Sequence, residues 1–256
     1  MITKVKRTND YPIPFSDGDK NFFDSTYQQV YSQLLDREVD DQIRFLKRNL
    51  LNEIENPHIL DFCCGHGRHL LRLWRDGYSV HGLDINEDYL KLINQKTSGE
   101  VTTFLADGRY FKSEQKYNVL LNMETSIGYL NDDENFKMLE CMYSCLNSNG
   151  KLLLHLANRE YLIKNFNPLV WFGNEQIGFS LERRTLDLQS SSLSINQTRI
   201  IDNKVTKYNL KLRLYSLSEI ASYLKQVGFN IENVFGDFSE SKYSIESPSI
   251  ILICTK

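Results

Sequence analysis

The spacing of apolar residues changes twice along the chain and divides it into three parts. Residues 21–51 carry apolar side chains at helical spacing in two stripes, which predicts two helices that meet near residues 35–37. Residues 58–156 alternate short apolar runs with amphipathic segments, which predicts strands and helices in turn. Residues 169–214 contain four strand-like runs joined by turns, and residues 216–255 return to a helix and two strands.

This alternation favours one fold class. Strands that alternate with helices over short loops form a mostly parallel sheet with helices on both faces. We therefore predict an α/β fold, in which the runs at about 165–214 form an inserted antiparallel β lid. The first twenty residues are rich in turn formers and lack a period, so we interpret them as an arm or loop.

Composition and charge exclude several classes of protein. Of the 256 residues, 41% are hydrophobic and 25% are charged, which excludes a disordered chain and a disulfide-stapled mini-protein. A net charge of −3 gives no bulk attraction to nucleic acid or to an anionic membrane. No long apolar run and no apolar leader core are present, so we expect no membrane span, no signal peptide and a cytoplasmic location. The five cysteines are expected to be reduced thiols rather than a disulfide or a metal site.

The turn after the first strand of the α/β part carries the first candidate chemistry. It runs from Asp61 through Cys63, Gly65 and Gly67 into a helix. In an open α/β sheet, ligands bind beyond the carboxyl ends of the strands, and glycines there let backbone approach a ligand closely. A dinucleotide site would need a further glycine at Leu70, and Asp61 would repel its pyrophosphate. A carboxylate attracts S-adenosylmethionine instead, because that cofactor carries an ammonium and a sulfonium.

Two more acids follow at the ends of the next two predicted strands. Asp84 ends the second strand, where a carboxylate can accept hydrogen bonds from ribose hydroxyls. Asp107 ends the third strand, where it could meet an adenine amino group. Each acid alone could equally be a helix cap, but three in order beside a glycine turn predict one cofactor site.

On these residues the chain resembles the class I S-adenosylmethionine-dependent methyltransferases. The turn from Asp61 to Gly67 matches their acid-x-Gly-x-Gly-x-Gly motif, except that Cys63 stands at the first glycine. The match continues in residues 82–86, 106–109 and 118–122. Residues 125–130, 157–161 and the tail around 236–248 look like a bacterial subgroup that acts mostly on small molecules or natural products.

The resemblance implies a Rossmann-like seven-stranded sheet with a parallel core and an antiparallel C-terminal strand. It also implies that residues 1–50 form an arm and helices over the cofactor site, and that residues 51–256 form the methyltransferase domain with its lid. Tyr27 and Tyr31 could equally be core aromatics at helical spacing. The residues implied for cofactor binding are Tyr27, Tyr31, Asp61, Cys63, Gly65, Gly67, Arg68, His69, Asp84, Ile85, Asn86, Asp107, Gly108, Arg109, Asn122 and Met123.

Two absent motifs narrow the substrate class. The segment after the fourth predicted strand lacks the Asn/Asp-Pro-Pro motif of relatives that methylate adenine or a glutamine amide. No Pro-Cys pair is present, which argues against cytosine methylation. RNA methylation would need a basic face, which the net charge does not favour. We therefore expect a small molecule or a short peptide as substrate, and no nucleic acid or membrane partner.

The lid is the segment predicted to face the substrate, because aromatic and arginine side chains suit an organic ligand with an anionic group. Alternate arginines could equally form a solvated strand face. Its candidate residues are Trp171, Phe172, Arg183, Arg213 and Tyr215. Near the methyl donor, Arg159 is the first candidate for a catalytic contact, and Glu124 and Tyr129 are further polar candidates.

No histidine stands out as a general base, and this favours one type of acceptor. An amine needs only to be neutral at the moment of attack, whereas a phenol or a carboxylic acid must ionise. The sequence thus leans toward N-methylation of an amine. O-methylation of a phenol or carboxylate remains open, as does a non-catalytic protein that binds the cofactor or a partner.

Overall fold

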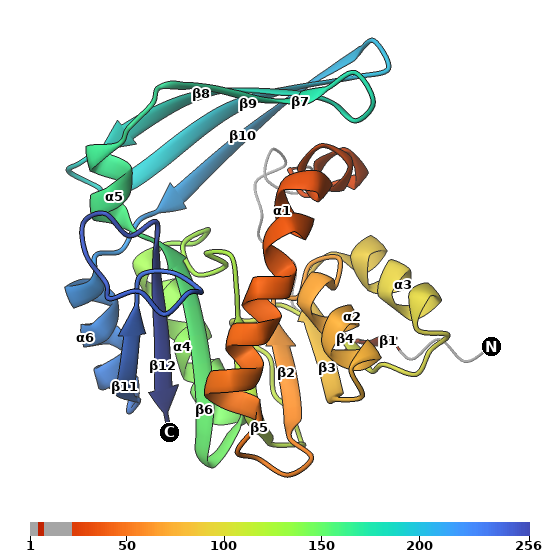
Figure 1. Cartoon of the computed structure of the whole chain (residues 1–256), viewed down its shortest axis with the longest axis vertical. Helices are drawn as coiled ribbons and strands as arrows, with labels where there is room; N and C mark the ends of the chain where they lie inside the picture. The colour runs from red at the N-terminus through yellow and green to blue at the C-terminus, as the bar shows by residue number, and fades with distance from the viewer. Residues whose placement is uncertain (1–4, 8–21) are drawn as a thin grey trace.

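The computed structural model describes residues 5–7 and 22–256 and arranges their strands in two sheets (Figure 1). The larger sheet has the strand order β1-β4-β3-β2-β5-β6-β12-β11. Its neighbours are parallel except at β12, which is antiparallel to both β6 and β11. This confirms the predicted seven-stranded core with an antiparallel C-terminal strand. The strands are β1 (Val5–Arg7), β2 (His58–Phe62), β3 (Ser79–Asp84), β4 (Thr103–Leu105), β5 (Tyr117–Asn122), β6 (Leu146–Ala157), β11 (Asn230–Phe235) and β12 (Ser249–Thr255).

The eighth strand, β1, lies in residues predicted to be an arm or loop, and for these three residues the prediction is wrong. β1 pairs in parallel with β4, with Val5 opposite Thr103 and Arg7 opposite Leu105. The edge of a sheet offers unpaired backbone groups to an extended segment, and such pairing needs no apolar period. The rest of the predicted arm lies outside the described residues.

Helices cover both faces of the larger sheet. On one face, α2, α3 and the C-terminal half of α1 share a core with Ile59, and on the other face α4 and α6 share a core with Leu60. Neighbouring residues of β2 enter different cores because side chains alternate along a strand. The helices are α1 (Ser25–Leu46), η1 (Lys47–Leu51), α2 (Arg68–Arg75), α3 (Glu87–Lys96), α4 (Asp132–Cys145), α5 (Arg159–Lys164) and α6 (Leu217–Val227).

Helix α1 replaces the two helices that the sequence predicted before residue 51. It is continuous over 22 residues and passes directly into the π-helical turn η1. Residues 35–37 contain no glycine or proline, so nothing breaks the backbone there. The two apolar stripes exist because the helix has two different neighbours, the smaller sheet near its start and the larger sheet near its end (Figure 1). None of the described helices is long and apolar enough to cross a membrane.

The smaller sheet is the predicted antiparallel lid and lies beyond the carboxyl ends of the parallel strands, above the start of α1 (Figure 1). Its order is β10-β9-β8-β7. Asp202 and Asn203 join β9 to β10 with φ of 49° and 61°, the left-handed values that a tight two-residue hairpin turn needs. The strands are β7 (Leu169–Asn174), β8 (Gly178–Asp187), β9 (Ser192–Ile201) and β10 (Lys204–Arg213).

The strand order of the larger sheet reverses at β2. The chain proceeds from β2 to β3 and β4 on one side, and to β5 and β6 on the other. In open α/β sheets the loops diverge at such a point and leave a crevice for a ligand. The fold therefore predicts a ligand-binding crevice at the ends of β2, β3 and β5.

Candidate functional site

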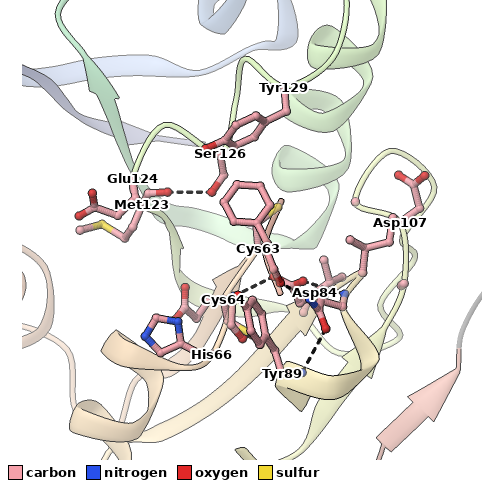
Figure 2. A pocket seen from close by; sticks show the side chains of 18 of the residues that line it. Cys63, Cys64, His66, Asp84, Tyr89, Asp107, Met123, Glu124, Ser126 and Tyr129 are labelled. Atoms are coloured by element: carbon pink, nitrogen blue, oxygen red, sulfur yellow. Dashed lines mark hydrogen bonds between the residues drawn. The ribbon is translucent and has the colours of Figure 1, made fainter. Parts of the chain in front are cut away.

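A cavity of about 900 Å³ lies at this reversal point, between the larger sheet, the start of α1 and the lid. Figure 2 shows Asp84 and Asp107 toward one end, Met123 and Glu124 toward the other, and Ser126 and Tyr129 above them. Most of the residues predicted for the site line this cavity. They are Tyr27, Asp61, Cys63, Gly65, Arg68, His69, Asp84, Ile85, Asn86, Asp107, Gly108, Arg109, Met123, Glu124 and Tyr129.

The turn between β2 and α2 brings its backbone to the cavity. Cys63, Gly65 and Gly67 all adopt left-handed backbone, with φ of 65°, 54° and 83°. A Cβ added at Gly65 would meet no atom within 4 Å, so this residue faces open space. A Cβ at Gly67 would lie 2.7 Å from Ile93 of α3, so Gly67 serves helix packing and does not line the cavity. Cys63, at the first glycine position of the motif, keeps the left-handed conformation that glycine favours.

Two of the predicted acids lie close together below this turn. Asp61 is 1% exposed, and its Oδ2 has no hydrogen-bond partner. Burial, followed by the charge of Asp84, raises the pKa of Asp61 to about 7. Asp84 accepts hydrogen bonds from the backbone N–H groups of Gly65 (2.7 Å) and Asn86 (2.8 Å), and burial raises its pKa. A buried, unpartnered carboxylate oxygen beside a second carboxylate favours a cationic ligand.

The third acid is engaged within the protein. Asp107 accepts hydrogen bonds from the backbone N–H of Arg109 (2.9 Å) and from its Nε (3.0 Å). The Arg109 guanidinium is 2% exposed and also pairs with Glu134 at the start of α4. Asp107 therefore lines the cavity with a carboxylate that is already charge-balanced, unlike Asp61.

The end of β5 supplies a second charged cluster at the opposite end of the cavity. Glu124 Oε1 accepts hydrogen bonds from Arg68 (2.7 Å) and from Gln42 Nε2 (2.9 Å), and Gln42 Oε1 lies 2.7 Å from His69 Nε2. Burial opposes ionisation of Glu124, but His155 and Arg68 outweigh it and lower its pKa to about 2. The carboxylate therefore keeps its charge at neutral pH.

The backbone at Glu124 is held in an unusual conformation. Glu124 and Thr125 are both left-handed, with φ of 56° and 60°. β6 fixes this turn, because Thr125 N–H donates to His155 O (2.9 Å) and Thr125 Oγ1 accepts from Ala157 N–H (2.8 Å). Such conformations persist where surrounding bonds over-determine them, and they cluster at functional sites.

Aromatic side chains from α1 and from the loop after β5 form the wall opposite the strand ends. Phe23 lies edge-to-face against Tyr27 and Tyr129, with ring centroids 5.0 and 5.4 Å apart. All three residues line the cavity. Tyr31 stacks on Tyr27 at 4.3 Å but does not line the cavity, since its hydroxyl donates to Glu182 of the lid (2.6 Å).

Some predicted residues are not brought to the cavity. Asn122 is buried behind it, where its Nδ2 donates to Phe62 O (2.9 Å). Arg159, the first catalytic candidate, opens α5 and donates from Nε to Ser191 Oγ (3.2 Å) in a lid loop. It also pairs with Glu160 (3.3 Å), so its charge is used away from the cavity.

None of the five predicted lid residues lines the cavity. Trp171 is 70% exposed and Arg183 is exposed as well, while Phe172 packs on Tyr31 with centroids 4.8 Å apart. Arg213 pairs with Asp132 and Glu219, and the Tyr215 hydroxyl donates to Asp132 (2.8 Å). Arg213 and Tyr215 thus connect the C-terminal end of β10 to α4 and α6. From the lid, Leu210 and Lys211 reach the cavity instead.

The residues that sequence reasoning missed lie on the aromatic wall, on the lid and next to the predicted residues at the strand ends. The signal for the first group was present, because Asp24 is the N-cap of α1 and Phe23 precedes it directly. Nothing in the lid sequence marked β10 as the strand that approaches the cavity. The missed lining residues are Phe23, Asp24, Cys64, His66, Leu83, Asp88, Tyr89, Ala106, Ser126, Leu130, Met138, Leu210 and Lys211. Among the described residues, no group of His, Cys, Asp and Glu could hold a metal ion.

Comparisons with known proteins agree on one family. A family model described as "Methyltransferase domain" matches residues 59–150. A putative methyltransferase of Geobacillus sp. (strain WCH70) is 22% identical over 208 residues, which are 77% of this chain and 84% of that protein. A dTDP-3-amino-3,4,6-trideoxy-alpha-D-glucopyranose N,N-dimethyltransferase of Streptomyces venezuelae is 30% identical over 80 residues, 31% of this chain and 33% of that protein.

A solved structure shares the fold over nearly the whole chain. It is the S-adenosylmethionine-dependent methyltransferase of Clostridium acetobutylicum ATCC 824, with a TM-score of 0.78 and 15% identity over 88% of this chain and 95% of that one. The family model spans β2 to the start of β6, which is the part of the sheet that forms the floor of the cavity. Fold, family model and relatives thus agree with the predicted S-adenosylmethionine-dependent methyltransferase, whose methyltransferase domain the family model places at residues 59–150.

Proposed function

We propose that this enzyme transfers a methyl group from S-adenosylmethionine to the nitrogen of a small-molecule amine, such as an amino sugar. The observation that carries the proposal is the asymmetry of the cavity. One end holds the acids at the ends of β2, β3 and β4, the other holds Glu124, which is ionised at neutral pH, and an aromatic wall faces both ends. The relative from Streptomyces venezuelae acts on a sugar amine, which supports the same class of acceptor.

The first end of the cavity fits the cofactor. Asp84 is the proposed partner of the ribose hydroxyls, and Asp107 borders the adenine. The unpartnered Oδ2 of Asp61 supplies negative charge for a cofactor that carries an ammonium and a sulfonium. Gly65 leaves the space that a side chain would fill. When bound, the sulfonium supplies an activated methyl group, so the protein mainly has to align the acceptor and exclude water.

The second end fits an amine. The rings of Phe23, Tyr27 and Tyr129 line the cavity, and aromatic rings attract the positive charge that develops on an amine nitrogen as it takes up the methyl group. Glu124 is paired with Arg68 through Oε1, and its carboxylate can accept a further hydrogen bond from an amine but not from a phenolate or a carboxylate, which have no proton to donate. We propose that Tyr129 and Glu124 bind the acceptor amine and that Phe23 and Tyr27 border both the acceptor and the cofactor. Lys211, from the lid, would meet an anionic group of the same substrate.

The titratable groups near this end are poor bases, which agrees with an amine acceptor. Burial, aided by the charge of Arg68, lowers the pKa of His69 to about 3, so its imidazole is neutral and weakly basic. Glu124, with a pKa of about 2, is weaker still as a base. Burial raises the pKa of the Tyr129 hydroxyl far above neutrality. An amine can lose its proton to water before it binds, whereas a phenol or carboxylic acid would need help.

The test is a methylation assay that reads the atom modified. The enzyme is incubated with S-adenosylmethionine and matched panels of amino sugars, other amines, short peptides and phenols, and products are identified by mass spectrometry and NMR. We expect methylation at nitrogen with release of S-adenosylhomocysteine. A methyl ether or ester as the main product would replace the proposal with O-methylation.

The Glu124→Gln variant tests the acceptor end. Gln keeps the size of the side chain and removes its charge, so the KM for an accepted amine should rise about tenfold or more, the value of one charge-assisted hydrogen bond. The affinity for S-adenosylhomocysteine should fall less than that. Glu175→Gln, in the exposed turn between β7 and β8, is the matched control. Equal KM values for both variants would remove Glu124 from the acceptor site.

The raised pKa of Asp61 predicts a proton release. At pH 7 this carboxyl is about half protonated before binding, and the cationic cofactor next to it should drive off the remaining proton. Calorimetric titrations with S-adenosylmethionine in phosphate and in Tris should therefore give different heats, because the two buffers take up protons with different enthalpies. The difference should vanish in Asp61→Asn; identical heats for the unmodified enzyme would contradict the prediction.

The same group predicts how stability varies with pH. The folded protein holds the Asp61 proton up to about pH 7, whereas the unfolded chain loses it near the ordinary aspartate pKa of 3.8. Folded molecules thus bind more protons between these values, so the Asp61 contribution to the free energy of unfolding falls as the pH rises through this window. Urea unfolding at pH 5 and pH 8 should show a smaller fall for Asp61→Asn than for the unmodified protein.

A further inference from the structure

Arg199, near the C-terminal end of β9, is a buried cation that the proposed chemistry does not use. Its side chain is 1% exposed, and it is one of the largest fully buried side chains in the described part of the chain. A buried guanidinium is costly unless its donors are satisfied. Arg199 does not line the cavity, so its guanidinium donors need hydrogen-bond acceptors within the protein.

Nearly all of these partners come from the start of α1, about 175 residues earlier in the chain. Nη1 donates to Asp24 Oδ1 (3.0 Å) and Thr26 Oγ1 (2.9 Å), and Nη2 donates to the carbonyl oxygen of Phe22 (2.6 Å). Nε donates to Gln197 Oε1 on the same strand (2.6 Å). One lid side chain thus holds the N-cap residue of α1 and its two flanks.

Aromatic rings enclose the same guanidinium. Its Cζ lies 4.0 Å from the ring centroid of Tyr208, 4.9 Å from that of Phe22 and 5.4 Å from that of Tyr27. Tyr27 lines the cavity, and so do Phe23 and Asp24. Arg199 therefore touches the back of the aromatic wall, on the side away from the cavity.

A second bridge joins the lid to the next turn of α1. Tyr31 OH donates to Glu182 Oε1 (2.6 Å), and Gln197 Nε2 donates to both Glu182 Oε1 (2.8 Å) and Tyr31 OH (2.7 Å). Gln197 is also the Nε partner of Arg199, so the two bridges form one network. Since Tyr31 stacks on Tyr27, both ends of the network converge on the same cavity residue.

We propose that Arg199 is a positioning residue that locks the first two turns of α1 and the lid sheet into a single cover, and thereby holds Phe23 and Tyr27 against the bound cofactor. The cover then closes over an occupied cavity as one body. Occupation of the cavity should stabilise β8 and β9, although neither strand lines it. The inference rests on cofactor binding and not on the nature of the acceptor.

The experiment compares amide hydrogen exchange with and without S-adenosylhomocysteine in the full chain. In the unmodified protein, the ligand should slow exchange in the turn 63–67, in residues 22–31 and in the lid strands 178–201. Arg199→Met should keep the protection of 63–67 and lose that of 178–201, while the affinity measured by calorimetry falls about tenfold through misplacement of the wall. Lys207→Met, an exposed lid cation on β10, is the matched control and should behave like the unmodified protein.

Asp24→Asn keeps the inference testable if Arg199→Met does not fold, and a double variant adds a second test if it does. Asp24→Asn keeps an N-cap residue but removes the charge that faces Arg199, and should give a weaker form of the same loss. In a Tyr27→Ala background, Arg199→Met should lower affinity little further, because it acts through that ring. Full lid protection in the folded Arg199→Met or Asp24→Asn variant would overturn the inference. No binding of S-adenosylhomocysteine by the unmodified protein would instead overturn the proposed cofactor site.

Discussion

The Asp84→Ala variant should bind S-adenosylmethionine about 12- to 160-fold more weakly than the unmodified enzyme, a loss of roughly 1.5–3 kcal/mol. Two backbone N–H groups, from Gly65 and Asn86, orient the Asp84 carboxylate at the edge of the cavity. A carboxylate held in this way accepts the two ribose hydroxyls at little entropic cost, because it is already ordered. Calorimetric titration of the purified variant measures the loss directly.

The folded state should tolerate this change, which separates a binding defect from a folding defect. Burial raises the pKa of Asp84, so the ionised carboxylate opposes folding at neutral pH and its removal relieves that cost. We expect a thermal unfolding temperature close to the unmodified value. Asp133→Ala, an acid in the exposed first turn of α4, provides the control for simple loss of negative charge. Unchanged affinity in a folded Asp84→Ala protein would exclude Asp84 from the cofactor site.

A single added methyl group at Gly65 should also abolish most cofactor binding. The Cβ of Gly65→Ala would project into the open space of the cavity, where no protein atom lies within 4 Å. Because the proposed cofactor passes this point of the backbone, we expect affinity to fall at least tenfold, as for the loss of a close backbone approach. The left-handed φ of 54° adds a stability cost of roughly 1–2 kcal/mol.

Gly77 offers a control with the same backbone strain and no ligand. It has a φ of 87°, and a Cβ there would likewise meet nothing within 4 Å, but it lies after α2 and does not line the cavity. Gly77→Ala should lose about as much stability as Gly65→Ala and keep its affinity for S-adenosylmethionine. If the two variants bind equally well, the cofactor does not approach the backbone at Gly65.

The end of the cavity that holds the three acids could be predicted because it depends on local sequence. A residue at the end of a parallel strand must lie at the carboxyl edge of the sheet. The positions of Asp61, Asp84 and Asp107 therefore follow once the strands are recognised. The glycine turn follows for the same reason, and even Cys63 takes up the glycine conformation that its place in the motif requires. What the sequence could not show was that Asp107 would be paired with Arg109, whereas Oδ2 of Asp61 would have no hydrogen-bond partner.

The acceptor end could not be predicted in the same way, because it depends on how separate segments meet. Alternation along β7 shows that Trp171 and Phe172 face opposite sides of the sheet, but not which side turns toward the cavity. Arg159 follows β6 directly, yet the buried Asn158 caps α5 and the arginine side chain reaches Ser191 in the lid. The single helix α1 was divided for a related reason: its apolar stripe changes where its packing partner changes, not where its backbone breaks.

The long separation along the chain between α1 and its partners in the lid fixes an order of events during synthesis. The start of α1 emerges from the ribosome early, but its partners Glu182 and Arg199 follow 151 and 175 residues later. Strands β2 to β5 can already pair in that interval, since domains acquire structure as their residues appear. The nascent protein therefore builds the floor of the cavity before the aromatic wall has its support. If Arg199 supports the wall as proposed, retention of the cofactor is expected only after translation has passed the lid.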